Sequence, residues 1–182
     1  MRLEDEQYEY IKTTVSDTFI EYGIKSTPIS AFEMAVKMGI KVIPYSALSE
    51  QKESAFLKLS NDGFLTEFCD HTWVIYYNDH CQSYGRINHT IMHEVGHYAL
   101  GHVKEGEEEE AEAEFFAKYA LAPPPLIHNM VESINPLSIM KKFDISYAAA
   151  LYAYKYYKSW LQYGQTEYTG YERKMLSQFS IA

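Results

Sequence analysis

Apolar residues recur at helical spacing near the start of the chain and predict two helices there. The first covers residues 5–22 and ends before Gly23. Its apolar positions are Tyr8, Ile11, Val15 and Phe19. The second starts at Ser26-Thr27-Pro28, with the proline near its first position, and ends at Gly39. Its apolar positions are Ile29, Phe32, Ala35 and Val36.

Short apolar runs in the next stretch predict a strand at residues 40–44 and a small antiparallel sheet within residues 54–80. The strands of that sheet are expected at residues 55–59, 64–66 and 73–77. Asn61-Asp62-Gly63 is a turn signal between the first two.

The second half of the chain has the pattern of a helical protein. Helices are expected at residues 86–102, 108–121, 126–133, 136–142 and 146–163. Pro123-Pro124-Pro125 ends the second of them. The polar, glycine-punctuated residues 164–182 are expected to form a loosely held tail.

This order of elements predicts an α+β fold. With 182 residues, the chain is expected to form one core with a helical extension. We place the core, a small antiparallel sheet packed on helices, at residues 1–125. The C-terminal helical extension at residues 126–182 is expected to pack on that core.

Composition narrows the range of functions. The net charge of −9 argues against a surface that binds nucleic acid. Cys69 and Cys81 are too few for a disulfide framework and are read as reduced, buried thiols. The N-terminus has no apolar signal core, and no apolar run approaches the roughly 20 residues that span a bilayer. We therefore expect a soluble cytoplasmic protein that does not bind membranes.

The chemistry is concentrated in His93-Glu94-Val95-Gly96-His97, which falls on the predicted 86–102 helix. Residues four apart share a helix face, so His93 and His97 can direct imidazole nitrogens at one ion. Zinc accepts such nitrogens and keeps a position for water in catalytic sites. Glu94 can take the proton of that water as a general base. The alternative, a surface helix with two ordinary histidines, is disfavoured by the apolar back face, the preceding strand and the glutamate-rich helix that follows.

A third ligand is expected from the acidic start of that next helix. Glu112 lies on the stripe that must face the core, whereas Glu110 and Glu114 lie four apart beside two alanines. Periodicity does not choose between Glu110 and Glu112. A carboxylate one turn after a ligand could also orient a ligating histidine. His89 and His102 are read as neighbours of the site rather than as ligands.

Two stretches resemble the ImmA/IrrE family of metallopeptidases. Residues 86–102 contain an arginine, a threonine, H-E-V-G-H-Y and then G-H, and residues 110–123 read E-A-E-A-E-F-F-A-K-Y-A-L-A-P. The resemblance extends over about residues 5–125. It implies a zincin-like core in which His93, His97 and Glu110 hold zinc and Glu94 is the base. Glu114 stands where the family typically has asparagine, a change that could alter the surroundings of the metal but removes no ligand.

The leading hypothesis is therefore a zinc-dependent endopeptidase that acts on a protein substrate. The family resemblance implies a helix-turn-helix transcriptional repressor, often of a mobile element or a stress response. The alternative is a zincin-like binding module that sequesters a repressor or antitoxin-type partner without cutting it, although such a binder needs no base. A weaker third hypothesis is a metal-dependent hydrolase of a non-peptide substrate, which a closed pocket would favour over an open groove.

Overall fold

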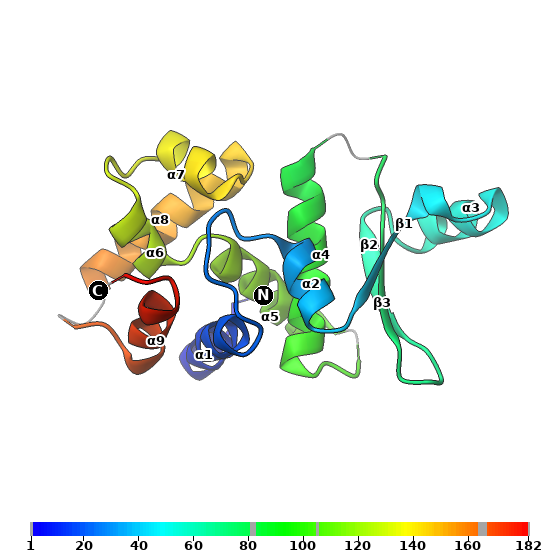
Figure 1. Cartoon of the computed structure of the whole chain (residues 1–182), viewed down its shortest axis with the longest axis horizontal. Coiled ribbons are helices and arrows are strands. Elements are labelled where there is room, and N and C mark those ends of the chain that lie inside the picture. The colour runs from blue at the N-terminus through cyan, green and yellow to red at the C-terminus, as the bar shows by residue number, and fades with distance from the viewer. Residues whose placement is uncertain (1, 81–82, 105, 164–166, 182) are drawn as a thin grey trace.

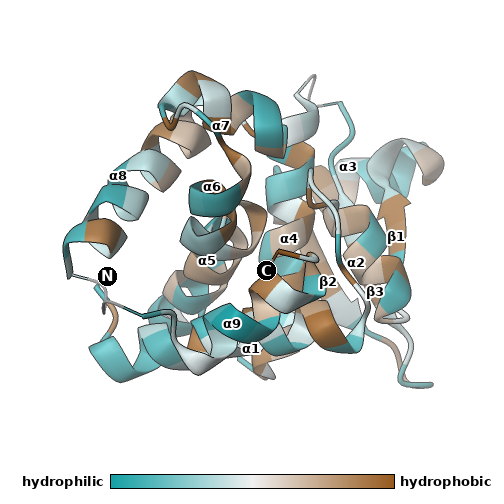
Figure 2. Ribbon diagram, turned by 60° about the vertical axis from the view of Figure 1, so that its left-hand side comes forward, coloured by the Kyte–Doolittle hydropathy of each residue, from teal (hydrophilic) through white to brown (hydrophobic). Residues whose placement is uncertain are grey.

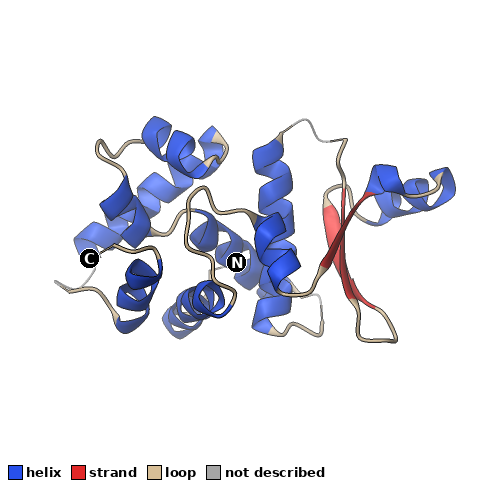
Figure 3. Ribbon diagram, viewed as in Figure 1, coloured by secondary structure: helices blue, strands red, loops and turns tan. Residues whose placement is uncertain are grey.

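Helices form most of the structure, and one small sheet lies among them (Figure 1, Figure 3). The computed structural model describes residues 2–80, 83–104, 106–163 and 167–181. The helices are α1 (Asp5–Glu21), α2 (Ala31–Lys37), α3 (Glu50–Leu59), α4 (Tyr84–Leu100), α5 (Glu107–Leu121), α6 (Pro124–Met130), α7 (Pro136–Phe143), α8 (Tyr147–Tyr163) and α9 (Gly170–Gln178). The strands are β1 (Lys41–Pro44), β2 (Gly63–Glu67) and β3 (Trp73–Tyr77), and a 3-10 turn follows β1 at Tyr45–Ala47. The predicted α+β class is confirmed.

The sheet has the strand order β1-β3-β2 and is mixed rather than purely antiparallel. β2 and β3 are antiparallel, with Gly63 opposite Tyr77. β1 runs parallel to β3, with Lys41 opposite Val74, because the chain crosses over through α3 and β2 before it forms β3. Figure 1 shows α2 and α4 on one side of this sheet and α3 on the other.

Residues 55–59, expected as a strand, belong instead to helix α3, which starts at Glu50. Its first turn is acidic, and carboxylates stabilise the N-terminus of a helix. The helix places Phe56 against Tyr76 of β3, with 4.9 Å between ring centroids, while Leu59 remains 69% exposed. Five residues of apolar alternation were too few to distinguish a strand from a helix that is covered on one face only.

Helix α2 also differs from its predicted start. It begins at Ala31 rather than near Pro28, because the hydroxyl oxygen of Ser30 accepts a hydrogen bond from the backbone N–H of Glu33. This is the bond of a helix N-cap, and it leaves Pro28 in the loop before the helix.

The predicted loosely held tail is wrong for residues 167–181, because α9 docks on α1. Thr169 and Glu172 form a reciprocal capping box at its start. Glu172 is buried and accepts a second bond from the indole N–H of Trp160, at 2.6 Å. Met175 and Leu176 bury the apolar side of the helix.

The core lies where α5 packs between α4 and α1. Val95 of α4 and Phe116 of α5 are fully buried, and each such side chain contributes about 1.5–3 kcal/mol. On the side toward α1, Phe115 meets Tyr8 edge to face, with 4.6 Å between ring centroids. In Figure 2, the hydrophobic colour of β1 reflects Val42 and Ile43, and α9 is mostly hydrophilic.

The C-terminal helices rest on this core. α8 packs against α6, α7 and α5, and α9 returns to α1. The division of the chain at residue 125 remains a prediction. No helix in the described ranges is long and apolar enough to cross a membrane.

Candidate metal centre

Helix α4 places the two histidines of the motif side by side. Its apolar residues, including Ile91 and Val95, are fully buried, and Gly101 ends it in the left-handed conformation at φ 71°. His93 and His97 consequently project from the same face one turn apart. Their Nε2 atoms lie 3.1 Å from each other.

Helix α5 brings Glu110 to this pair. Glu110 Oε2 lies 3.3 Å from His93 Nε2, and its Oε1 lies 3.2 Å from His97 Nε2. The close approach of the helices depends on Gly96. A Cβ there would lie 3.1 Å from Cδ1 of Phe116 and 3.2 Å from the carbonyl oxygen of Ala113.

The three side chains fit the coordination of a metal ion. One donor atom from each of His93, His97 and Glu110 lies within 4.8 Å of the other two. Ligand atoms bound tetrahedrally at roughly 2.0–2.1 Å lie about 3.3 Å from one another, which matches the separations of 3.1–3.3 Å found here. Two imidazoles and a carboxylate are the donor set of a catalytic zinc site.

Glu112, the other candidate for the third ligand, points elsewhere. Its Oε2 lies 3.0 Å from Nε2 of His102, and its Oε1 accepts a hydrogen bond of 2.9 Å from Gln7 of α1. His102 in turn meets Nδ1 of His97 at 2.9 Å. The geometry therefore favours Glu110 as a ligand, whereas Glu112 reaches His97 only through His102.

Glu94 lies in the same cleft as the candidate ligands. It is 8% exposed, and it lines a cavity of about 480 Å³ together with His93, His97 and Glu110. The opposite wall comes from the end of α3 and from β2, including Gly63. Glu94 is thus placed to act on a molecule held beside the three donors.

The charges around the site affect the two histidines in opposite ways. Burial lowers the pKa of His93, but the carboxylates of Glu114, Glu94 and Glu110 outweigh it, so the pKa is raised. Burial, followed by the charge of His93, lowers the pKa of His97 to about 4. A neutral His97 has a lone pair available for a metal.

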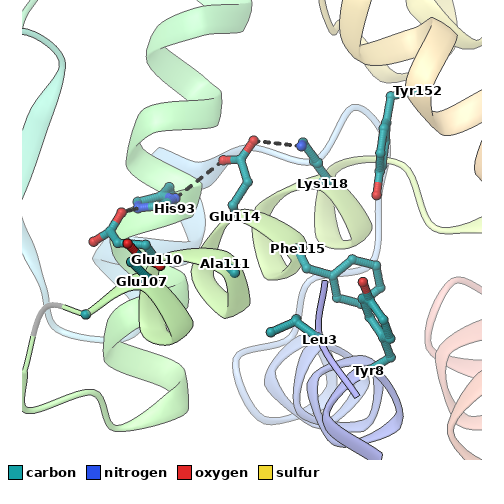
Figure 4. Close-up of a pocket in the computed structure, with 11 residues that line it drawn as sticks. Leu3, Tyr8, His93, Glu107, Glu110, Ala111, Glu114, Phe115, Lys118 and Tyr152 are labelled. Atoms are coloured by element: carbon teal, nitrogen blue, oxygen red, sulfur yellow. Dashed lines mark ion pairs between the residues drawn. The ribbon is translucent and has the colours of Figure 1, made fainter. Parts of the chain in front are cut away.

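Glu114 supports His93 from the other side. Figure 4 shows His93 between Glu110 and Glu114, with Lys118 beyond Glu114. Glu114 Oε2 lies 3.5 Å from His93 Nδ1, and its Oε1 lies 2.9 Å from the Lys118 ammonium. Burial raises the pKa of Glu114, but these two partners prevail and lower it to about 2. The carboxylate is therefore ionised and can accept the Nδ1 proton of His93, which leaves Nε2 directed at the other donors.

A larger groove continues from the site along α5. It has a volume of about 960 Å³ and runs from His93 and Glu110 past Glu114 to Tyr8 and Tyr152 (Figure 4). An open groove next to the candidate metal centre suits an extended chain better than it suits a small molecule.

The structure also places the remaining residues weighed from the sequence. His89 lies 3.5 Å from Glu114 and not with the three donors. The prediction that Cys69 is buried is wrong, because its side chain is exposed. Cys81 lies outside the described residues.

The sequence did not predict the contact of Gln7 with Glu112 or the contacts of His102 with His97 and Glu112. Two features of the sequence could have pointed to these contacts: His102 follows His97 by five residues, and Glu112 is the acidic residue of α5 that is not needed as a ligand when Glu110 takes that place. No local pattern connects these residues to Gln7, which is 105 positions away from Glu112 in the sequence.

One family model matches the chain: the IrrE N-terminal-like domain of the M78 peptidases matches residues 37–155. The matched range includes the whole sheet, both motif helices and the first half of α8. It excludes α1 and α9. A search of curated proteins finds no match to this chain.

Proposed function

The chain belongs to the IrrE N-terminal-like family of metallopeptidases, and on that premise we propose that it is a zinc-dependent endopeptidase. One observation carries the proposal: the donor atoms of His93, His97 and Glu110 converge in the cleft that Glu94 lines. These three residues would hold the ion, and Glu94 would serve as general base.

Each residue has a separate role in peptide hydrolysis: metal binding, proton transfer or positioning of a ligand. When bound, zinc lowers the pKa of water and polarises the scissile carbonyl. Glu94 removes a proton from the attacking water and passes it to the amide nitrogen of the departing peptide. Glu114 keeps His93 oriented, and the buried surroundings of His97 keep its imidazole neutral.

We propose a protein segment in extended conformation as the substrate. β2 is at an edge of the sheet and pairs with β3 alone among the described strands. Its first residues line the cleft opposite α4, so a peptide could lie along β2 with its scissile bond near Glu94. The family resemblance suggests a helix-turn-helix transcriptional repressor as the source of that segment.

The test is cleavage of a purified helix-turn-helix repressor, chosen from a neighbouring gene where one encodes such a protein. The zinc-loaded wild type should release fragments that mass spectrometry can assign to one bond. Glu94→Gln should bind zinc with wild-type affinity and release none, because it keeps the shape of the side chain and loses the base. A chelator should abolish cleavage by the wild type.

Two results would overturn the proposal in different ways. Cleavage by Glu94→Gln at the wild-type rate would remove Glu94 from the mechanism. A stable stoichiometric complex with zinc present and no fragments would show a binding module instead of a peptidase.

A further inference from the structure

A chain of hydrogen bonds extends from His97 to the N-terminal helix. His97 Nδ1 lies 2.9 Å from His102 Nδ1, and His102 Nε2 lies 3.0 Å from Glu112 Oε2. Glu112 Oε1 accepts from the side-chain amide of Gln7 at 2.9 Å. The side chain of His102 is 8% exposed and that of Glu112 is 17% exposed, so little water competes for these bonds.

The chemistry of the partners determines the direction of each bond. An ionised carboxylate only accepts, so His102 donates to Glu112 through Nε2. A neutral imidazole that donates through one nitrogen accepts through the other, so His102 Nδ1 accepts from His97 Nδ1. His97 therefore carries its proton on Nδ1 and presents a bare Nε2 on the side of His93 and Glu110.

Gln7 fixes the far end of this chain. Its side-chain oxygen accepts from the backbone N–H of Glu4 at 2.8 Å. Its amide nitrogen consequently faces the carboxylates, and it donates to Glu112 and, at 2.6 Å, to Glu108. Gln7 thus ties α1, which lies outside the matched residues 37–155, to the metal centre.

We propose that Gln7, Glu112 and His102 form a positioning relay that holds His97 in the tautomer and orientation needed to bind the metal. The proposal rests on the proposed function, because it assigns His97 as a ligand. His102 and Glu112 are positioning residues that act through His97 and do not touch the ion. Groups that orient ligands in this way commonly change metal affinity by about 10–100-fold.

The first experiment measures zinc affinity by competition with a chelator. His102→Leu removes the acceptor and should weaken binding by about 10–100-fold. His102→Asn should stay within a few-fold of wild type, because the amide oxygen can take the place of Nδ1 and accept from His97. Gln7→Ala should give a smaller loss than His102→Leu. His128→Leu is the matched control, since His128 has a hydrogen bond of 2.9 Å to Tyr157 remote from this site, and it should bind zinc as the wild type does.

The second measurement does not need the metal. Nitrogen-15 NMR of the histidine rings in the zinc-free protein should show His97 protonated on Nδ1 in the wild type and in His102→Asn. It should show loss of that tautomer in His102→Leu. If His102→Leu fails to fold, His102→Asn and Gln7→Ala still test the relay by both measurements.

The outcomes separate the relay from the proposed function. Wild-type zinc affinity in His102→Leu, or an Nε2-protonated His97 in the wild type, would overturn the relay alone. Equal losses in His102→Asn and His102→Leu would also overturn it. A wild-type protein that binds no zinc would overturn the proposed function and the relay with it.

Discussion

Replacing Gly96 by alanine should disturb both the core and the metal centre. Gly96 lies between the two motif histidines, on the side of α4 that packs against α5. An added Cβ would lie 3.1 Å from Cδ1 and 3.2 Å from Cβ of Phe116, and 3.2 Å from the carbonyl oxygen of Ala113. Ordinary contacts of a Cβ begin at 3.4 Å. Because one of these atoms belongs to the backbone of α5, the two helices must move apart by a few tenths of an ångström.

The magnitude follows from two opposing effects. Overpacking of a core costs about 1–3 kcal/mol, and alanine gains about 1 kcal/mol over glycine inside a helix. We expect a net destabilisation of about 0–2 kcal/mol. The metal centre is more sensitive, because metal–ligand distances tolerate only about 0.2 Å and Glu110 is on the helix that moves. We expect zinc affinity to fall about tenfold or more.

Two measurements and one matched control decide the outcome. Urea unfolding of the zinc-free protein gives the stability, and competition with a chelator gives the zinc affinity. Gly170→Ala is the control, because no atom lies within 4 Å of the added Cβ at the start of α9. It should gain about 0.4–1 kcal/mol and leave zinc affinity unchanged. The reasoning is refuted if Gly96→Ala gains as much stability as the control and binds zinc as tightly as the wild type.

Three further predictions concern protons, the support of His93 and the last helix. Zinc affinity should fall about tenfold as the pH drops from about 6 to about 5, because one proton must leave His93 for each ion that binds, while His97, with a pKa of about 4, is already neutral. Calorimetric titrations at several pH values measure the number of protons released, and release of two protons per ion in that interval would contradict the prediction. Glu114→Gln removes the carboxylate that raises the pKa of His93 against the effect of burial, so NMR titration should show a lower pKa of His93, and zinc affinity should fall about tenfold. An unchanged pKa would show that Glu114 does not support His93. Thr169→Ala removes the N-cap of α9 and should lower the free energy of unfolding, measured with urea, by about 1 kcal/mol without changing zinc affinity. No loss of stability would mean that α9 contributes little to the folded state.

Local pattern was enough for much of the fold. The helices α1, α4, α5 and α8 and the strand β3 match their expected positions within a few residues. Each is long or strongly apolar on one side. The structure differs from the prediction where the apolar pattern was short or the pairing partner was remote in the sequence. Residues 55–59 are in a helix, and β1 joins the sheet parallel to β3. Pairing of β1 with β3 depends on how α3 and β2, which come between them in the sequence, are placed in the fold, and no local pattern encodes that.

The third ligand shows the same limit inside the site. Helical periodicity left Glu110 and Glu112 open because α5 is buried on two sides. Its small residue Ala113 faces Gly96 of α4, and its large residue Phe115 faces Tyr8 of α1. Glu110 is one turn from Ala113 and comes to the histidines. The geometry that favours Glu110 depends on how the two helices cross, which the spacing of the residues does not predict.

Gly96 and Gln7 both affect the position of α5, the helix that carries Glu110. A metal centre built from two helices needs the helices held at one separation, and two independent contacts do this. Gly96 sets how near α5 can come to α4, and Gln7 of α1 holds the side of α5 that carries Glu112. A change at either position should therefore act on the same three donors from opposite sides of α5. The Gly96→Ala and Gln7→Ala effects on zinc affinity should then depart from additivity in the double variant, as effects do when two substitutions bear on one shared element.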